Sequence, residues 1–399
     1  MVGKHNTDAD YASWVQAAGN ERPAAVVDLD AVERNLDTLV LQAGGKPLRL
    51  VTKSIRCREV LAHCLHYLGH HCAGLMAYHP AEAAWLSGCF NQSILIAYPS
   101  LNRRALSQAL QAVGQGADIT FMVDSAAHLQ ALASQRPDDA LTIKVAIDLD
   151  LSSHWPRLCF GVQRSSVRDV RRLRALVQAI QRAAHFRLVG VLGYEAQIAG
   201  VPDALPGKPL HGALVPGLKR LSQRHVRRWR YSAVKAIQAE GIELAFVNGG
   251  GTGSVAWTAG CPEVTEVAVG SGVFAPHLFD HYASLELTPA AGFVLSVDRY
   301  PEPGVLTCGG GGYVASGAAD SSRLPRPVWP TGARLLPLEG AGEVQTPVRA
   351  PLSSQAESVV FRHAKAGELC ERFDSLILHR GGKAEASAST YRGEGRTFI

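Results

Sequence analysis

A lysine at the end of an apolar run is the first residue in the sequence that could do chemistry. Residues 48–52 read as a short strand, and Lys53 follows them directly. In parallel α/β barrels the active site gathers at the carboxyl ends of the strands. Apolar neighbours withdraw water from an amine there and make it a better nucleophile for a carbonyl carbon. Lys53 is therefore a candidate nucleophile, and an ordinary surface lysine at a strand end is the alternative.

Two glycine-rich turns could bind an anion. The run NGGGTGS at 248–254 follows one apolar segment, and VGSGVF at 269–274 follows the next one. Successive glycines let backbone N–H groups approach an anion, and the hydroxyls of Thr252 and Ser254 can add hydrogen bonds. Barrels commonly bind phosphate after their last two strands, which is where these turns fall. A pair of ordinary tight turns is the alternative.

Further polar side chains follow other predicted strands and would line the same end of a barrel. They are Tyr194, Glu195 and Gln197 after one strand, and Asp148, Asp150 and Arg157 after another. Ordinary loop polarity would account for either group taken alone.

The elements that must position these residues alternate along most of the chain. Between about residues 24 and 275, short apolar runs are followed by amphipathic stretches, which gives eight or nine strands separated mostly by helices. Repeated strand–helix units imply a parallel sheet covered by helices. Eight units over roughly 250 residues fit a closed (β/α)8 barrel. A doubly wound open sheet is the alternative, since periodicity does not give strand order.

The composition changes after about residue 283, where helical patterns fade and Gly, Pro, Val and Thr dominate. We therefore predict an α/β protein with two domains: a barrel over 22–282 and a mostly β domain over 283–399, with residues 1–21 as a candidate addition to the second.

The overall composition excludes several classes of protein. No apolar run reaches the ~20 residues of a membrane-spanning helix, and the N-terminus lacks the apolar stretch of a secretory signal. We therefore expect a cytoplasmic protein that binds no membrane.

The cysteines and the basic stretches suggest no special chemistry. Eight scattered cysteines predict free thiols. The basic stretches 164–182 and 219–230 could contact nucleic acid, but a solvated helix face is expected, since neither interleaves aromatic residues.

Taken as a set, these motifs resemble a known group of enzymes. The chain is similar to fold-type III pyridoxal-phosphate enzymes, and within them to D-threonine aldolases, D-serine dehydratases and bacterial amino acid deaminase/aldolase proteins. The matching stretches, between about residues 22 and 396, are 22–37, 51–54, 193–201, 248–254, 310–317 and 361–373. The resemblance implies an alanine-racemase-like barrel, a C-terminal β domain, and a homodimer in which the partner's β domain completes each active site.

The resemblance also implies roles for single residues. Lys53 would be the catalytic lysine and form a Schiff base with pyridoxal 5'-phosphate. The other residues implied to bind the cofactor are Arg157, Tyr194, Gly250, Gly251, Thr252, Gly270 and Ser271. In relatives the arginine lies two residues before a Gly-Val pair, whereas Arg157 lies four residues before Gly161.

Relatives bind a divalent ion through a His-x-Cys or His-x-Asp pair, and this chain departs from that pattern. The matching segment reads His363-Ala364-Lys365. An ammonium group does not ligate a cation, so no metal-binding residues are predicted. Our hypothesis is that Lys365, with His363 and Gln197 nearby in the substrate's surroundings, supplies the positive charge that polarises a substrate hydroxyl.

These features predict a lyase that acts on a D-β-hydroxy amino acid. It would give either glycine and an aldehyde, or ammonia and a 2-keto acid, with Lys53 as general base. A racemase or epimerase is one alternative, for which Tyr300 and Tyr313 are candidate second bases by location only. A non-catalytic protein of cofactor homeostasis is another, although its small relatives lack the C-terminal domain.

Overall fold

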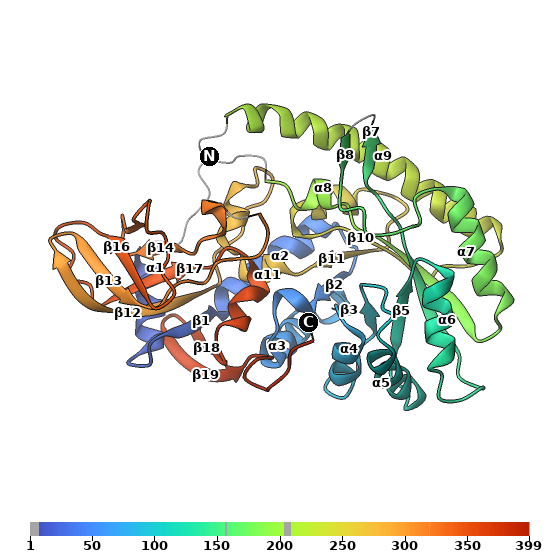
Figure 1. The fold of residues 1–399 in the computed structure, drawn as a ribbon, viewed down its shortest axis with the longest axis horizontal. Helices are drawn as coiled ribbons and strands as arrows, with labels where there is room; N and C mark the ends of the chain where they lie inside the picture. Colours follow the sequence, from blue (N-terminus) through green and yellow to red (C-terminus); the bar gives the residue numbers. More distant parts are fainter. Residues whose placement is uncertain (1–7, 156–157, 203–208, 319, 399) are drawn as a thin grey trace. The chain divides into compact units, whose positions relative to one another are not determined.

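The structure, a computed structural model, describes residues 8–155, 158–202, 209–318 and 320–398 (Figure 1). No helix within these ranges is both long enough and apolar enough to cross a lipid bilayer.

The described residues form two compact units. The barrel unit consists of Leu39–Lys53, Gly69–Val269 and Phe398. The sheet unit consists of Ser54–Leu68, Gly270–Thr397 and the N-terminal segment up to Thr38. The domain bounds 22–282 and 283–399 stay a proposal.

Eight parallel strands of the barrel unit close on themselves in the order β10, β11, β2, β3, β4, β5, β6, β9. Their bounds are β2 (Leu48–Val51), β3 (Cys72–Ala77), β4 (Ile94–Ile96), β5 (Ile119–Val123), β6 (Ile143–Asp148), β9 (Phe186–Gly193), β10 (Phe246–Gly249) and β11 (Glu266–Val269). The closed ring confirms the predicted (β/α)8 barrel, and the doubly wound alternative is wrong.

One shared apolar cluster fills the inside of the barrel. Seven strands contribute to it with side chains that include Met76, Leu95, Met122, Leu192 and Phe246. Such a barrel is a packed core and not a pore. Chemistry therefore has to take place at the ends of the strands.

Helices cover the outside of the barrel, as Figure 1 shows for α4 to α7. The best-defined is α7 (Val170–Arg182), where Asp169 caps the first turn by accepting the N–H of Arg172 at 2.8 Å. Its buried residues, among them Leu173 and Val177, recur at helical spacing and face the strands. The others are α4 (Pro80–Ser87), α5 (Arg103–Gly114), α6 (Ala126–Ser134), α8 (Ala196–Ala199), α9 (Pro209–Ala239) and α10 (Val255–Ala259), with the hairpin β7 (Ser153–Trp155) and β8 (Leu158–Phe160).

The sheet unit is built on a nine-stranded sheet, which confirms the predicted mostly β domain. Its strands are β1 (Ala24–Asp28), β12 (Ala291–Glu302), β13 (Val305–Gly309), β14 (Arg326–Trp329), β15 (Arg334–Leu335), β16 (Gln345–Arg349), β17 (Ser358–Arg362), β18 (Ser375–Arg380) and β19 (Lys383–Ser389). Its longer helices are α1 (Asp8–Ala18) and α3 (Arg58–Leu68), and the short α11 (Ser271–Phe274) and η6 (Ala366–Glu371) also belong to it. The helix α2 (Leu29–Ala43) continues from this unit into the barrel unit.

The strand β1 occupies the middle of this sheet. It pairs antiparallel with β12 and parallel with β18, with Ala25 opposite Phe293 and Leu376. Helix α1 packs on it through Trp14, whose side chain is fully buried. The apolar run that opens the alternating pattern is therefore a strand of the sheet unit and not the first strand of the barrel.

Candidate active site

Lys53 lies where the sequence predicted, directly after β2. It belongs to the single turn η1 (Thr52–Ser54) and is half-buried. The hydroxyl of Thr52 donates to the carbonyl of Met76 at 3.0 Å, which ties this turn to β3. The Lys53 Nζ atom donates a hydrogen bond to the hydroxyl of Tyr98 at 2.7 Å. The lysine is thus held at the carboxyl end of the strands by a partner that sequence reasoning missed.

Two tyrosines gather at this end of the barrel. Tyr98 and Tyr194 are half-buried, and both pack against the apolar cluster inside the barrel. Burial raises the pKa of Tyr194 to about 12, and the neighbouring charge of Glu195 adds to the shift. Tyr194 therefore keeps its proton at neutral pH and can act as a hydrogen-bond donor.

The glycine-rich turn after β10 lies against Tyr194. Gly250 has φ +90°, a left-handed conformation that favours glycine. A Cβ atom on Gly251 would lie 3.0 Å from a ring carbon of Tyr194 and 3.2 Å from the side chain of Ala199. The turn therefore favours glycine at both positions, at Gly250 for its conformation and at Gly251 for its close approach to the tyrosine ring.

A buried carboxylate holds this turn in place. Glu195 is fully buried and accepts the N–H of Gly250 at 3.1 Å and the hydroxyl of Ser254 at 3.2 Å; the hydroxyl of Thr258 donates to it as well. The Nη1 atom of Arg230, also fully buried, lies 3.6 Å from Glu195. The sequence suggested that Glu195 lines the mouth of the barrel, whereas its carboxylate is engaged in fixing the glycine turn.

The same Arg230 makes a second buried ion pair. Its Nε atom donates to Glu263 at 3.0 Å, and the side chains are almost completely enclosed. Sequence reasoning missed both residues, because Arg230 is one of many basic residues in α9 and nothing in its spacing separates it from the exposed ones.

Acidic residues follow the neighbouring strands β5 and β6. Burial, together with the charges of Asp124 and Asp150, raises the pKa of Asp148 to about 8. Asp148 thus keeps its proton near neutral pH.

Two further predicted site residues are Gln197 and Arg157. Gln197 is buried and donates from Nε2 to the carbonyl of Leu151 at 2.7 Å. The predicted Arg157 lies outside the described residues.

Two predicted phosphate-binding residues belong to the sheet unit. Gly270 follows β11 directly in the chain, and Ser271 begins the short helix α11. The hydroxyl of Ser271 lies 3.3 Å from that of Ser54, the residue after Lys53. Their role as phosphate ligands stays a prediction.

His363 and Lys365, the two residues of the predicted charge-assisting segment, also belong to the sheet unit. His363 is buried, and burial lowers its pKa to about 3, with the charge of Arg362 acting in the same direction. Lys365 donates from Nζ to the hydroxyl of Ser316 at 2.9 Å, and the Ser316 N–H donates to Glu368 at 2.9 Å. Within the described ranges no three His, Cys, Asp or Glu side chains gather as a metal ion would require. That this chain works without a metal ion stays a prediction.

The candidate second bases of a racemase lie in the sheet unit too. Tyr300 is 54% exposed and donates to the carbonyl of Ala356 at 3.2 Å. Tyr313 packs edge-on against Phe293 and Phe373.

The described residues thus form a closed parallel barrel and a separate β sheet, and Lys53 lies at the end of a barrel strand. This is the architecture expected of alanine-racemase-like proteins. The sequence profile of the family described as alanine racemase, N-terminal domain, matches residues 27–276. The chain belongs to this family, and the resemblance that the sequence indicated is confirmed.

Individual proteins resemble the chain as well. A D-threo-3-hydroxyaspartate dehydratase from Delftia sp. (strain HT23) is 28% identical over 261 residues, which is 64% of this chain and 61% of the relative. The alignment thus spans less than two thirds of that protein. The structure of D-threonine aldolase from Filomicrobium marinum matches 94% of this chain and 95% of its own, with a TM-score of 0.78 and 21% identity. The structure of alanine racemase from Clostridium difficile 630, in complex with cycloserine, matches 93% of this chain and 99% of its own. Its TM-score is 0.67 and its sequence identity is 12%. At these identities the structural matches establish the fold.

Proposed function

We propose that this chain is a pyridoxal-phosphate-dependent lyase that acts on a D-β-hydroxy amino acid. The observation that carries the proposal is the position of Lys53 at a strand end, with its Nζ atom 2.7 Å from the Tyr98 hydroxyl. The names of the similar proteins support the substrate class, because D-threo-3-hydroxyaspartate and D-threonine are both D-β-hydroxy amino acids.

The residues of the barrel unit fit the proposed cofactor. Lys53 offers an amine for its aldehyde, and the glycine turn offers closely approaching backbone around Gly251 and Thr252 for its phosphate. The ring of Tyr194 lies against that turn and would flank the pyridine ring. When bound, pyridoxal phosphate supplies an electron sink for negative charge at the Cα atom of an amino acid.

The protein's own contribution is to place and move a proton. We propose that Lys53 Nζ is the general base. It takes the proton from the substrate's Cα atom when the β-hydroxyl is lost, and the proton of the β-hydroxyl when the Cα–Cβ bond breaks and an aldehyde leaves. The Tyr98 hydroxyl holds that nitrogen in place by its hydrogen bond. Tyr194 stays protonated, so it can donate to an oxygen of the bound ligand without adding charge. Aldol cleavage and loss of the β-hydroxyl are the two outcomes we propose for this substrate class.

The experiment is an absorption spectrum followed by product analysis. With added pyridoxal phosphate, the wild-type protein should show a visible band that borohydride removes, and Lys53→Ala should lack it. Lys144→Ala is the matched control, because this exposed lysine pairs with Asp118 elsewhere in the same unit. A panel of D- and L-β-hydroxy amino acids should then yield an aldehyde or a 2-keto acid from a D isomer.

Two results would contradict the proposal. A wild-type protein that stays colourless with added cofactor would remove the cofactor assignment. A coloured protein that transforms no amino acid in the panel would favour the homeostasis alternative. The homodimer and the cytoplasmic location stay predictions.

A further inference from the structure

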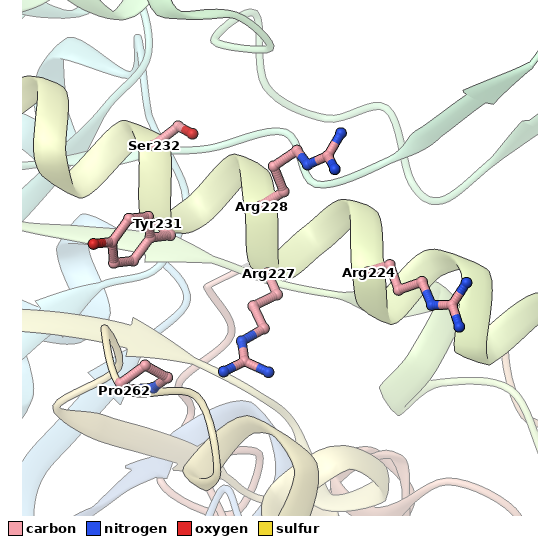
Figure 2. A pocket seen from close by; sticks show the side chains of 6 residues that line it. All are labelled: Arg224, Arg227, Arg228, Tyr231, Ser232 and Pro262. Carbon is pink, nitrogen blue, oxygen red and sulfur yellow. The ribbon is translucent and has the colours of Figure 1, made fainter.

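The outer face of helix α9 carries a group of arginines that the proposed function does not use. Arg224, Arg227 and Arg228 are exposed and, with Tyr231, Ser232 and Pro262, line a hollow of about 420 Å³ on the barrel unit. Figure 2 shows Arg227 extending from the helix toward the side on which Pro262 lies. The hollow thus combines guanidinium groups with the carbon surface of a tyrosine and a proline.

The fold does not need these arginines. The opposite face of α9 buries Val226, Ala233 and Ile237 completely, and these residues hold the helix on the barrel. The exposed residues Arg220, Arg224, Arg227 and Tyr231 are spaced by three or four positions, so they form one continuous stripe on the helix.

No carboxylate of the described residues neutralises the positive charge of Arg224, Arg227 and Arg228. The sequence of α9, from Pro209 to Ala239, contains no Asp or Glu. Among the described residues, no carboxylate lies within 4 Å of the side-chain nitrogens of Arg224, Arg227 or Arg228. Like charges three or four residues apart repel each other and destabilise a helix.

Helix α7 shows the usual arrangement for comparison. It is also rich in arginine, but Arg172 pairs with Asp169 at 3.6 Å and Arg174 with Glu240 at 3.8 Å. Arg224, Arg227 and Arg228 are therefore available to carboxylates that come from outside this chain.

We propose that the α9 stripe, with Tyr231 and Pro262, binds an acidic peptide segment of a partner protein. Guanidinium groups bind carboxylates through two parallel hydrogen bonds. Arginine and tyrosine are also the residue types enriched where protein interfaces gain most of their binding energy. The partner's carboxylates face the arginines, and an apolar side chain between them enters the hollow beside Tyr231 and Pro262.

The geometry sets the size of the segment. From Arg220 to Tyr231 the stripe is about 16 Å long at the ~1.5 Å rise of an α-helix, which matches an extended peptide of about five residues. A single-stranded nucleic acid is less well matched, because it requires successive aromatic side chains for stacking and Tyr231 is the one aromatic residue that lines this hollow.

The test uses the full chain and an array of hexapeptides. One half of the array contains two to four Glu or Asp residues beside one or two Leu, Phe or Tyr residues, and the other half carries Gln and Asn in place of the acids. The variant is Arg224→Glu with Arg227→Glu and Arg228→Glu. The control is Arg171→Glu with Arg174→Glu and Arg182→Glu in α7, which changes the net charge by the same amount. Circular dichroism checks that both variants fold.

We expect binding to favour the acidic peptides and to weaken with salt. Fluorescence anisotropy with the best peptide should show at least a tenfold higher Kd for the α9 variant, and a Kd close to that of the wild type for the α7 control. The proposal is overturned if acidic and neutral peptides bind alike, or if both variants lose binding equally. It is also overturned if an oligothymidylate probe binds more tightly than any peptide through the same arginines. Self-association of the wild type that the α9 variant abolishes, seen by sedimentation, would assign the surface to a second copy.

Discussion

Glu195 and Arg230 lie 3.6 Å apart, and neither side chain is exposed to solvent. Glu195 lies between β9 and α8 and Arg230 belongs to α9, yet Glu195 also accepts the N–H of Gly250 in the glycine turn that follows β10. A buried charge needs compensation, and Glu195 and Glu263 together balance the charge of Arg230, while Glu195 also accepts the N–H of Gly250. The pair therefore fixes the turn that we propose for phosphate binding.

The first prediction concerns this pair. Glu195→Ala should lower the stability of the cofactor-free protein by about 1–3 kcal/mol, because the N–H of Gly250 and the hydroxyl of Ser254 lose a buried acceptor, while Arg230 keeps its ion pair with Glu263. It should also weaken cofactor binding, since Gly250 loses the acceptor of its N–H. Glu195→Gln keeps an acceptor and should retain part of the cofactor affinity. Thermal unfolding and spectrophotometric titration with pyridoxal phosphate measure the two effects.

The control for this prediction is Glu243→Ala, an exposed carboxylate in the same unit. Equal melting temperatures and cofactor affinities for Glu195→Ala and Glu243→Ala would show that Glu195 does not position the turn.

The second prediction concerns the hydrogen bond between Lys53 and Tyr98. Tyr98→Phe removes the hydroxyl that holds Nζ but keeps the ring in the apolar cluster. A hydrogen bond to a charged group contributes about 1.5–3 kcal/mol, so kcat should fall roughly 10- to 100-fold. The pH profile of kcat should change as well, while the melting temperature stays close to that of the wild type. Unchanged kcat with an unchanged pH profile would exclude Tyr98 from the reaction.

The third prediction concerns Asp148 and pH. Burial raises the pKa of Asp148 from the ordinary 3.8 to about 8, so the folded protein keeps a proton that the unfolded chain releases. The stability should therefore fall as the pH rises from about 4 to about 8, and Asp148→Asn should remove this loss. A change of ~1 kcal/mol corresponds to roughly 2–4 °C in Tm.

Thermal unfolding between about pH 5 and about pH 8 measures this effect. The exposed Asp139→Asn is the control. If the Tm of Asp148→Asn falls with pH as steeply as that of the wild type, Asp148 is not the group that titrates.

The fourth prediction concerns Lys365. We propose that its ammonium group supplies the positive charge that assists departure of the substrate's hydroxyl. Lys365→Ala should then lower kcat at least tenfold, Lys365→Arg should retain more activity, and a chelator should leave the wild type unaffected. Lys383→Ala, an exposed lysine at the start of β19, is the control. Loss of wild-type activity with chelator and its recovery with a divalent ion would contradict this hypothesis.

The sequence predicted the barrel well because each strand–helix unit is local. The alternating apolar runs mark β2 to β6 in order, and the capped helices between them leave few ways to connect parallel strands. The sequence did not predict where the strand at 24–28 belongs. Its neighbours β12 and β18 lie hundreds of residues away, and such pairing leaves no trace in local periodicity.

The site was predictable to the extent that it depends on strand ends and glycines. Lys53 and the turn after β10 were found because both follow apolar runs directly. Tyr98 lies near the end of another such run, SILIAYP at 93–99, and this position could have identified it as a candidate site residue. The Glu195–Arg230 pair left no such signal, because a helix that packs from outside brings the arginine to the turn.

The central position of β1 has a consequence for the order in which the chain can fold on the ribosome. The residues of β1 are synthesised before every barrel strand, but the parallel partner of Val26 is Ile377, which is synthesised after all of them. The barrel strands, all between Leu48 and Val269, can pair before β12 and β18 emerge. During synthesis β1 therefore waits without its neighbours, and a nascent chain arrested before β12 should display this apolar segment to chaperones until elongation resumes.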